Sequence, residues 1–227
     1  MTQKCAVIFG ATGLTGSALL NELLLSPHYL RVYAFTRSPI LTEHAKLEVF
    51  EQPLDAINNE TISLLPNEMD VFFCLGTTLA KAGSKDMFKK VDYYLPLKLV
   101  NMFARKADHF LIISSLGAQP DSLSFYLSVK GQLEVDLKVL DIERLTIFRP
   151  SLLVGDRKEK RFKEDFSSTL SKLVNPLFSF KVLKKYKPTD CEDLAKAMCL
   201  VATTGKGLGN ARTNVISSDM IADLINS

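Results

Sequence analysis

The fold is decided by residues 4–16, which read Lys-Cys-Ala-Val-Ile-Phe-Gly-Ala-Thr-Gly-Leu-Thr-Gly. The apolar run Cys5–Phe9 predicts a buried strand, and the apolar pattern over Leu14–Leu25 predicts a helix. Glycines spaced three apart join the two: Gly10, Gly13 and Gly16. A strand, a glycine-rich turn and a helix in this order are typical of the first part of a dinucleotide-binding βαβ unit.

Phosphate chemistry explains why such a turn is rich in glycine. Glycine lets the backbone approach a pyrophosphate closely, and the helix N-terminus offers unpaired N–H groups and a partial positive charge. No lysine follows Gly16, so the loop that cradles nucleoside triphosphates is a poor match. A tight turn that binds no ligand is the alternative interpretation.

The composition is that of an ordinary globular protein large enough to bury a core, with 227 residues, 47% hydrophobic and 23% charged. The formal net charge of +3 is too small to indicate nucleic-acid binding. No apolar run approaches the length of a membrane span. The basic run 157–163 has two interpretations: a solvated loop, or a contact from Arg161 to an anionic ligand or a cofactor phosphate.

The four cysteines and three histidines show no spacing typical of a metal site. Cys5 and Cys74 lie inside apolar strand runs, where cysteine acts as a small core residue. We therefore predict no metal site, and this cysteine usage indicates a reducing, cytoplasmic location.

Strand and helix patterns alternate along the first 150 residues. Strands, most of them continuous apolar runs, are predicted over Cys5–Phe9, Arg31–Thr36, Leu47–Phe50, Asp70–Leu75, Phe110–Ser114 and Leu145–Phe148. Helices are predicted over Leu14–Leu25, Asp86–Lys106 and Phe125–Leu140. The alternation predicts a Rossmann-type α/β fold, a doubly wound parallel sheet with ligands at the carboxyl ends of its strands.

The regular alternation of strand and helix patterns ends after Pro150. The expected elements there are an amphipathic stretch, a capped helix, a short strand and a last helix, over Phe166–Phe180, Leu194–Ala202, Thr213–Ile216 and Ser218–Ile225. We interpret residues 1–227 as one dinucleotide-binding domain in which 151–227 form the small substrate-facing part.

The second strand ends at Thr36-Arg37-Ser38, where an acidic residue would hold the ribose 2′-hydroxyl of NAD. This chain offers Arg37 instead, and a guanidinium makes charge-assisted bonds to a 2′-phosphate. We therefore expect Arg37 and Ser38 to contact NADP(H). A surface arginine after a strand is the alternative.

The fourth strand ends in Cys74-Leu75-Gly76. Gly76 lacks a side chain where the backbone would pass the adenine ribose and the phosphates. A simple turn at the end of the strand is the other interpretation.

The fifth strand ends in Ser114-Ser115, and Tyr126 and Lys130 follow on the next helix, four residues apart and hence on one face. A nearby ammonium favours the phenolate and lowers the pKa of a tyrosine. Tyr126 could then give a proton to a carbonyl oxygen during hydride transfer, with a serine hydroxyl holding that oxygen. A second Tyr-x-x-x-Lys, Tyr94 to Lys98, contains a proline and follows no strand-end serine, so we interpret it as structural.

Together these residues resemble the short-chain dehydrogenase/reductase superfamily, in its atypical or extended branch. Ser115, Tyr126 and Lys130 match its catalytic serine, tyrosine and lysine, with Ser114 as a competitor for the serine. A closer resemblance is to the Tat-interacting oxidoreductase-like group, carried by segments 74–78, 91–93, 126–131 and 148–150. It implies a bound NADPH that contacts Thr12, Gly13, Leu14, Thr15, Arg37, Leu75, Gly76, Tyr126, Lys130, Leu153 and Arg161.

One departure from the superfamily concerns an asparagine that often completes its proton relay. Asp92 stands at the aligned position, and Asn101 lies further along. Asp92 could cap or pair structurally instead, so its role stays open.

The leading hypothesis is an NADPH-dependent reductase of a small carbonyl compound. The alternative is an NADPH-binding regulator with little turnover and a protein partner, because some relatives in the group are described as regulators. A nucleotide-sugar epimerase is a third hypothesis, which Arg37 and the short substrate part disfavour.

Overall fold

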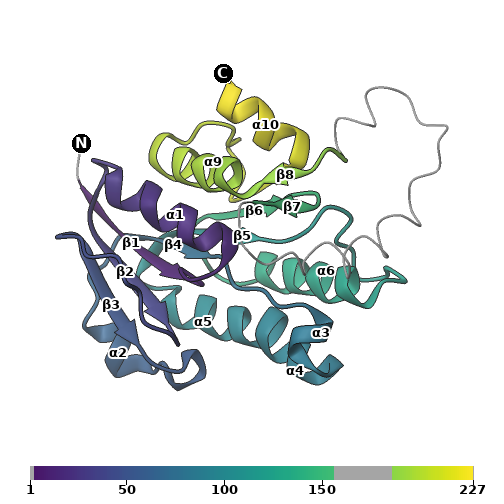
Figure 1. The fold of residues 1–227 in the computed structure, drawn as a ribbon, viewed down its shortest axis with the longest axis horizontal. Coiled ribbons are helices and arrows are strands. Elements are labelled where there is room, and N and C mark those ends of the chain that lie inside the picture. The colour runs from purple at the N-terminus through teal and green to yellow at the C-terminus, as the bar shows by residue number, and fades with distance from the viewer. Residues whose placement is uncertain (1–2, 156–185, 227) are drawn as a thin grey trace.

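The structure is a computed structural model that describes residues 3–155 and 186–226. Seven parallel strands form one sheet between two helical layers, in the order β3-β2-β1-β4-β5-β6-β9 (Figure 1). These strands are β1 (Lys4–Phe9), β2 (Tyr29–Thr36), β3 (Leu47–Glu51), β4 (Met69–Phe73), β5 (Ala107–Ile113), β6 (Leu145–Arg149) and β9 (Thr213–Ser217). The strand order reverses direction between β1 and β4, which confirms the Rossmann-type α/β fold.

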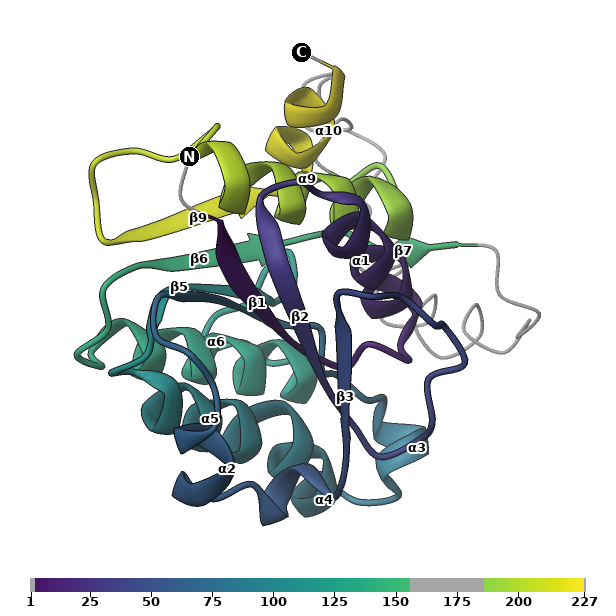
Figure 2. The same ribbon diagram turned by 90° about the vertical axis from the view of Figure 1, so that its left-hand side faces the viewer.

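The two faces of the sheet bury two apolar cores. Helices α1 (Leu14–Leu25), α9 (Cys191–Thr204) and α10 (Ser218–Asn226) cover one face, and α5 (Leu95–Phe103) and α6 (Phe125–Lys138) cover the other (Figure 2). All five residues of β4 are buried, since helices cover both sides of this central strand. The continuous apolar runs in the sequence therefore correspond to strands that face no solvent.

The predicted helix over Asp86–Lys106 is present as an uninterrupted helical run from Lys85 to Phe103, but its middle turn is π-helical. The segment divides into α4 (Lys85–Lys89), a π-helical turn (Lys90–Tyr94) and α5, with Pro96 in the first turn of α5. Proline has no N–H to bond a carbonyl one turn earlier, and the Leu95 N–H instead reaches back to the carbonyl of Lys90.

Several short elements were not predicted because each is too brief for a periodic signal. They are a 3₁₀ turn (Leu54–Ala56), α2 (Asn59–Ser63), α3 (Leu79–Ala82), and the parallel pair β7 (Leu153–Val154) and β8 (Thr189–Asp190). The predicted stretch Phe166–Phe180 lies outside the described residues. In the described part of the chain, no helix has both the length and the apolar character needed to cross a membrane.

His109 is a buried titratable side chain inside β5. It is 2% exposed, and its Nε2 lies 2.8 Å from the hydroxyl of Thr146 on β6. Burial, helped by the charges of Arg144 and Lys4, lowers the pKa of His109 from 6.5 to about 3. Between these values the unfolded chain binds a proton that the folded chain does not, so stability falls as the pH falls.

We predict that His109→Gln flattens the pH dependence of unfolding. Below pH 6.5, His109 makes the free energy of unfolding of the wild-type protein fall by roughly 1.4 kcal/mol for each unit by which the pH falls. The variant lacks this contribution. Urea unfolding of both proteins between about pH 6 and pH 4 measures it. His44→Gln at an exposed site is the matched control, and equal slopes for His109→Gln and wild type would contradict the prediction.

Candidate functional site

The glycine turn packs against the backbone at the end of β4. Gly10 has a φ of +85°, and a Cβ there would lie 2.6 Å from the carbonyl oxygen of Cys74. A Cβ at Gly16 would overlap the carbonyl of Gly10. Both positions therefore require glycine, because the first turn of α1 rests directly on the end of β1.

The N-terminus of α1 has no cap from a side chain. Gly13 is the N-cap residue, and the first turn of the helix contains no acidic residue. Thr12 is exposed, Leu14 is half-buried and Thr15 is buried at this end. Uncapped amides without a carboxylate beside them can accept an anion, so the fit of a dinucleotide pyrophosphate here is good.

The end of β2 presents Arg37 to solvent. The hydroxyl of Thr36 donates to the carbonyl of Ser38 at 2.7 Å and accepts from the Ser38 N–H at 3.1 Å, which fixes the turn. Within residues 3–155 and 186–226, the Arg37 guanidinium makes no hydrogen bond or ion pair, and it can therefore bind an anion.

The end of β4 leaves open space at Gly76. A Cβ there would contact only the Asp92 carboxylate, at 3.6 Å among the described atoms. Protein packing therefore does not require glycine at this position, unlike at Gly10 and Gly16. Leu75 is half-buried against the core under α5 and α6. The open side of Gly76 fits a ligand that passes close to the backbone.

Ser115, Tyr126 and Lys130 come together as predicted. The side chain of Ser115 hydrogen-bonds with Tyr126, and Lys130 lies close enough to influence the phenol electrostatically. Ser115 and Lys130 are 5% and 4% exposed, whereas Tyr126 is half-buried. The ring of Phe88 on α4 packs edge-on against Tyr126, with 5.8 Å between centroids. A phenol, a hydroxyl and an ammonium thus share one site.

The electrostatics of Tyr126 differ from the expectation. Burial raises its pKa, Lys130 and the Ser115 hydrogen bond lower it, and Asp92 raises it again, with a net shift upward. Lys130 acts in the predicted direction, but the prediction of a lowered pKa for Tyr126 is wrong. The expectation left out the burial of the phenol, which is the largest cause of the raised pKa, and the Asp92 carboxylate, whose place beside the lysine no spacing rule revealed.

Asp92 lies on the π-helical turn and is 1% exposed. One carboxylate oxygen lies 2.7 Å from the ammonium of Lys130, and the other accepts a hydrogen bond of 2.8 Å from the N–H of Thr77. The carboxylate therefore joins the loop after β4 to α6.

Ser114 belongs to a separate buried network. Its hydroxyl donates to Glu134 at 2.6 Å, and Arg149 binds the same carboxylate with two nitrogens. Glu134 is 2% exposed, so Arg149 compensates its charge. This engagement of Ser114 leaves Ser115 as the hydroxyl beside Tyr126. Glu134 carries no recognisable sequence signal beyond being a charged residue on the buried face of a helix.

The second Tyr-x-x-x-Lys copy does not form such a site. Tyr94 is exposed, and the Lys98 ammonium donates to the carbonyls of Asp55 and Ile57 at 2.8 and 3.4 Å. Lys98 thus fastens α5 to the 3₁₀ turn, which agrees with the structural interpretation.

The C-terminal part contributes less of the predicted site. Leu153 packs on the core beneath α1, and a Cβ at Gly155 would come within 3.0 Å of the Leu14 side chain, so this segment passes the start of α1. Arg161 lies outside the described residues. In the described part, residues 186–226 supply β9, α9 and α10.

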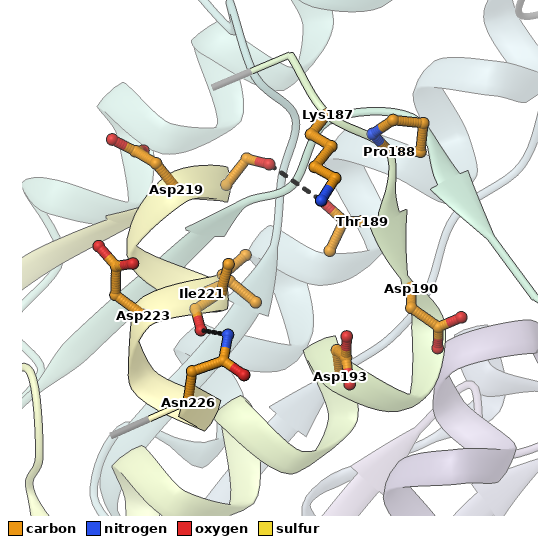
Figure 3. A pocket seen from close by; sticks show the side chains of 11 residues that line it. Lys187, Pro188, Thr189, Asp190, Asp193, Asp219, Ile221, Asp223 and Asn226 are labelled. Atoms are coloured by element: carbon orange, nitrogen blue, oxygen red, sulfur yellow. Dashed lines mark hydrogen bonds between the residues drawn. The ribbon is translucent and has the colours of Figure 1, made fainter. Parts of the chain in front are cut away.

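A cavity of about 190 Å³ lies between β8, α9 and α10 (Figure 3). Its lining includes four carboxylates, Asp190, Asp193, Asp219 and Asp223. None of the predicted catalytic or cofactor-binding residues lines it. Carboxylates repel phosphate, so this cavity does not suit the dinucleotide. Across the described residues, no group of three or more His, Cys, Asp or Glu side chains could hold a metal ion.

Comparison with known proteins gives the family. The HIM1 family matches residues 36–185. The chain is 35% identical to the mitochondrial protein FMP52 of Candida glabrata over 162 residues, covering 70% of this chain and 68% of that protein. It is 37% identical to protein HTATIP2 of Rattus norvegicus over 164 residues, covering 71% and 67%. The chain belongs to the HIM1 family, and its similarity to HTATIP2 confirms the resemblance to the Tat-interacting-protein-like group.

Solved structures agree on the fold. MoeE5, in complex with UDP-glucose and NAD, has a TM-score of 0.67 at 17% identity, with 96% of this chain and 79% of that chain covered. This likeness shows that the two chains share a Rossmann-type α/β fold.

The expectation of a cytoplasmic location is corrected by the relatives. The FMP52 proteins that match this chain are named mitochondrial, which contradicts that expectation. The expectation was based on the cysteines, none of which forms a disulfide. Cys191 and Cys199 are buried and pack as small side chains in the protein interior, so their presence does not indicate a compartment.

Proposed function

We propose that the protein is an NADPH-dependent oxidoreductase that reduces a small carbonyl compound, with Tyr126 as the acid and base. The observation that carries the proposal is the hydrogen-bonded Ser115–Tyr126 pair beside Lys130, at the carboxyl end of β5. The same edge of the sheet holds the uncapped start of α1 and the open backbone at Gly76.

The residues that would hold the cofactor follow the sheet edge. The amides at the start of α1, from Gly13 to Gly16, would bind the pyrophosphate, and Arg37 would bind the 2′-phosphate of the adenine ribose. Leu75 and Gly76 would lie beside the ribose and phosphates, and Leu153 beside the start of α1. When bound, a reduced nicotinamide supplies a hydride to the carbonyl carbon.

The proton in this reaction comes from the chain itself. Ser115 orients the carbonyl oxygen of the substrate, and Tyr126 donates its phenolic proton to that oxygen. Lys130 stabilises the phenolate that remains until water returns a proton. In the oxidative direction, the Tyr126 phenolate removes the proton of the alcohol.

We predict that Arg37→Ala weakens NADPH binding by roughly 10- to 100-fold, the cost of losing charge-assisted hydrogen bonds to phosphate. NADH has no 2′-phosphate, so its affinity should not change. Titration calorimetry with both cofactors measures this, and Arg31→Ala, near the opposite end of β2, is the control. Equal losses of affinity for NADPH and NADH, or no loss for either cofactor, would show that Arg37 does not bind the 2′-phosphate.

We predict that Tyr126→Phe lowers kcat for carbonyl reduction by about 10²- to 10⁴-fold, because the variant lacks the donated proton. The NADPH dissociation constant should stay within a few-fold of the wild-type value. Stopped-flow oxidation of NADPH with a panel of aldehydes and ketones provides the measurement, with Tyr94→Phe as the control at the exposed copy. Unchanged turnover in Tyr126→Phe would disprove the mechanism.

Tight NADPH binding without turnover by the wild-type protein would instead favour the regulatory alternative. That function predicts a protein partner whose affinity depends on NADPH. Pull-downs with and without NADPH then distinguish the two.

A further inference from the structure

Asp92 has an unusual position for a carboxylate. It lies on the π-helical turn between α4 and α5, and only 1% of its surface is exposed. Both oxygens contact donors: Oδ1 lies 2.7 Å from Lys130 Nζ, and Oδ2 accepts from the Thr77 N–H at 2.8 Å. One buried side chain therefore connects the end of β4, the π-helical turn and the helix that carries Tyr126.

Lys130 is a buried cation whose neighbours supply the opposite charge. Burial lowers its pKa, but attraction to Asp92, Tyr126 and Glu134 outweighs burial and raises the pKa overall. Glu134 is already bound by Arg149 and Ser114. Asp92 is therefore the main counter-charge of Lys130, and it directly offsets the field that the ammonium exerts on its surroundings.

Tyr126 experiences both charges. The charged and titratable groups that face it are Lys130, Asp92 and the hydroxyl of Ser115. Lys130 favours the phenolate, whereas Asp92 favours the phenol. The protonation of Tyr126 thus depends on the lysine and the aspartate together, not on the lysine alone.

We propose that Asp92 is a positioning residue that holds Lys130 against the loop after β4 and sets the pH at which the Tyr126–Lys130 pair loses its first proton. The inference rests on the proposed function for its chemical consequence. In reduction, the O–H bond of Tyr126 breaks and a new O–H bond forms on the substrate oxygen, while the carbonyl carbon would gain a C–H bond from the hydride that a reduced nicotinamide supplies when bound. Because Asp92 keeps the phenol protonated to higher pH, the site favours proton donation over proton removal.

Asp92→Asn is the direct test, because asparagine has nearly the same shape and keeps an acceptor for the Thr77 N–H while removing the charge. An NMR titration follows the Tyr126 ring and the Lys130 carbon next to Nζ in the protein without cofactor. The first deprotonation of the pair should move to lower pH in Asp92→Asn, whichever group loses its proton first. An unchanged or higher midpoint would overturn the proposal.

Two further variants separate charge from structure. Tyr93→Phe breaks a hydrogen bond of 2.5 Å to Asp136, which links the same π-helical turn to α6, but it leaves the Asp92 charge in place. Its titration should match wild type, and Asp92→Glu should restore most of the wild-type midpoint. A shift in Tyr93→Phe equal to that of Asp92→Asn would assign the effect to loosened packing. If Asp92→Asn does not fold, Asp92→Ser is judged by the same criterion.

Kinetics then connect the titration to turnover. With a carbonyl substrate, the alkaline limb of the kcat profile should move to lower pH in Asp92→Asn, by the shift seen in the NMR titration. Turnover in wild type with an unmoved limb would overturn the inference and leave the proposed function intact. Absence of wild-type turnover would count against the proposed function alone, because the titration needs neither cofactor nor substrate.

Discussion

The position of α1 depends on a backbone contact that only glycine permits. Gly10 lies against the carbonyl of Cys74, and Gly16 lies against Gly10, so the helix begins directly at the end of β1. A side chain at either position would push α1 away from the sheet. The same contact brings the uncapped amides of the helix to the reversal point of the strand order, where parallel α/β sheets bind their ligands.

Two buried carboxylates, Glu134 and Asp92, connect α6 to the ends of different strands. Glu134 binds Arg149 and Ser114 and thereby fixes the ends of β5 and β6. Asp92 binds Lys130 and Thr77 and fixes the end of β4. Each is compensated by a cation, which burial of a charge requires. In this arrangement Ser115 hydrogen-bonds with Tyr126, while Ser114 hydrogen-bonds with Glu134.

Much of this could be predicted from local patterns. The strands were predicted because continuous apolar runs mark buried strands, and Leu14–Leu25 was predicted with the bounds that α1 has. Tyr126 and Lys130 were found because four residues make one helical turn. The π-helical turn inside the predicted helix was missed although Pro96 signals an irregularity, because the apolar spacing continues on both sides of the turn. The pairings of Asp92 and Glu134 were not predictable, since they join segments far apart in the sequence.

The cofactor site at the start of α1 is the claim on which the enzymatic and the regulatory hypotheses both rest. NMR titration of the wild-type protein with NADPH, together with calorimetry, tests it most directly. We predict saturable binding with the largest amide shifts at Gly13–Gly16, followed by Gly76. Absence of binding by either pyridine dinucleotide, or shifts centred on the acidic cavity between α9 and α10, would contradict it.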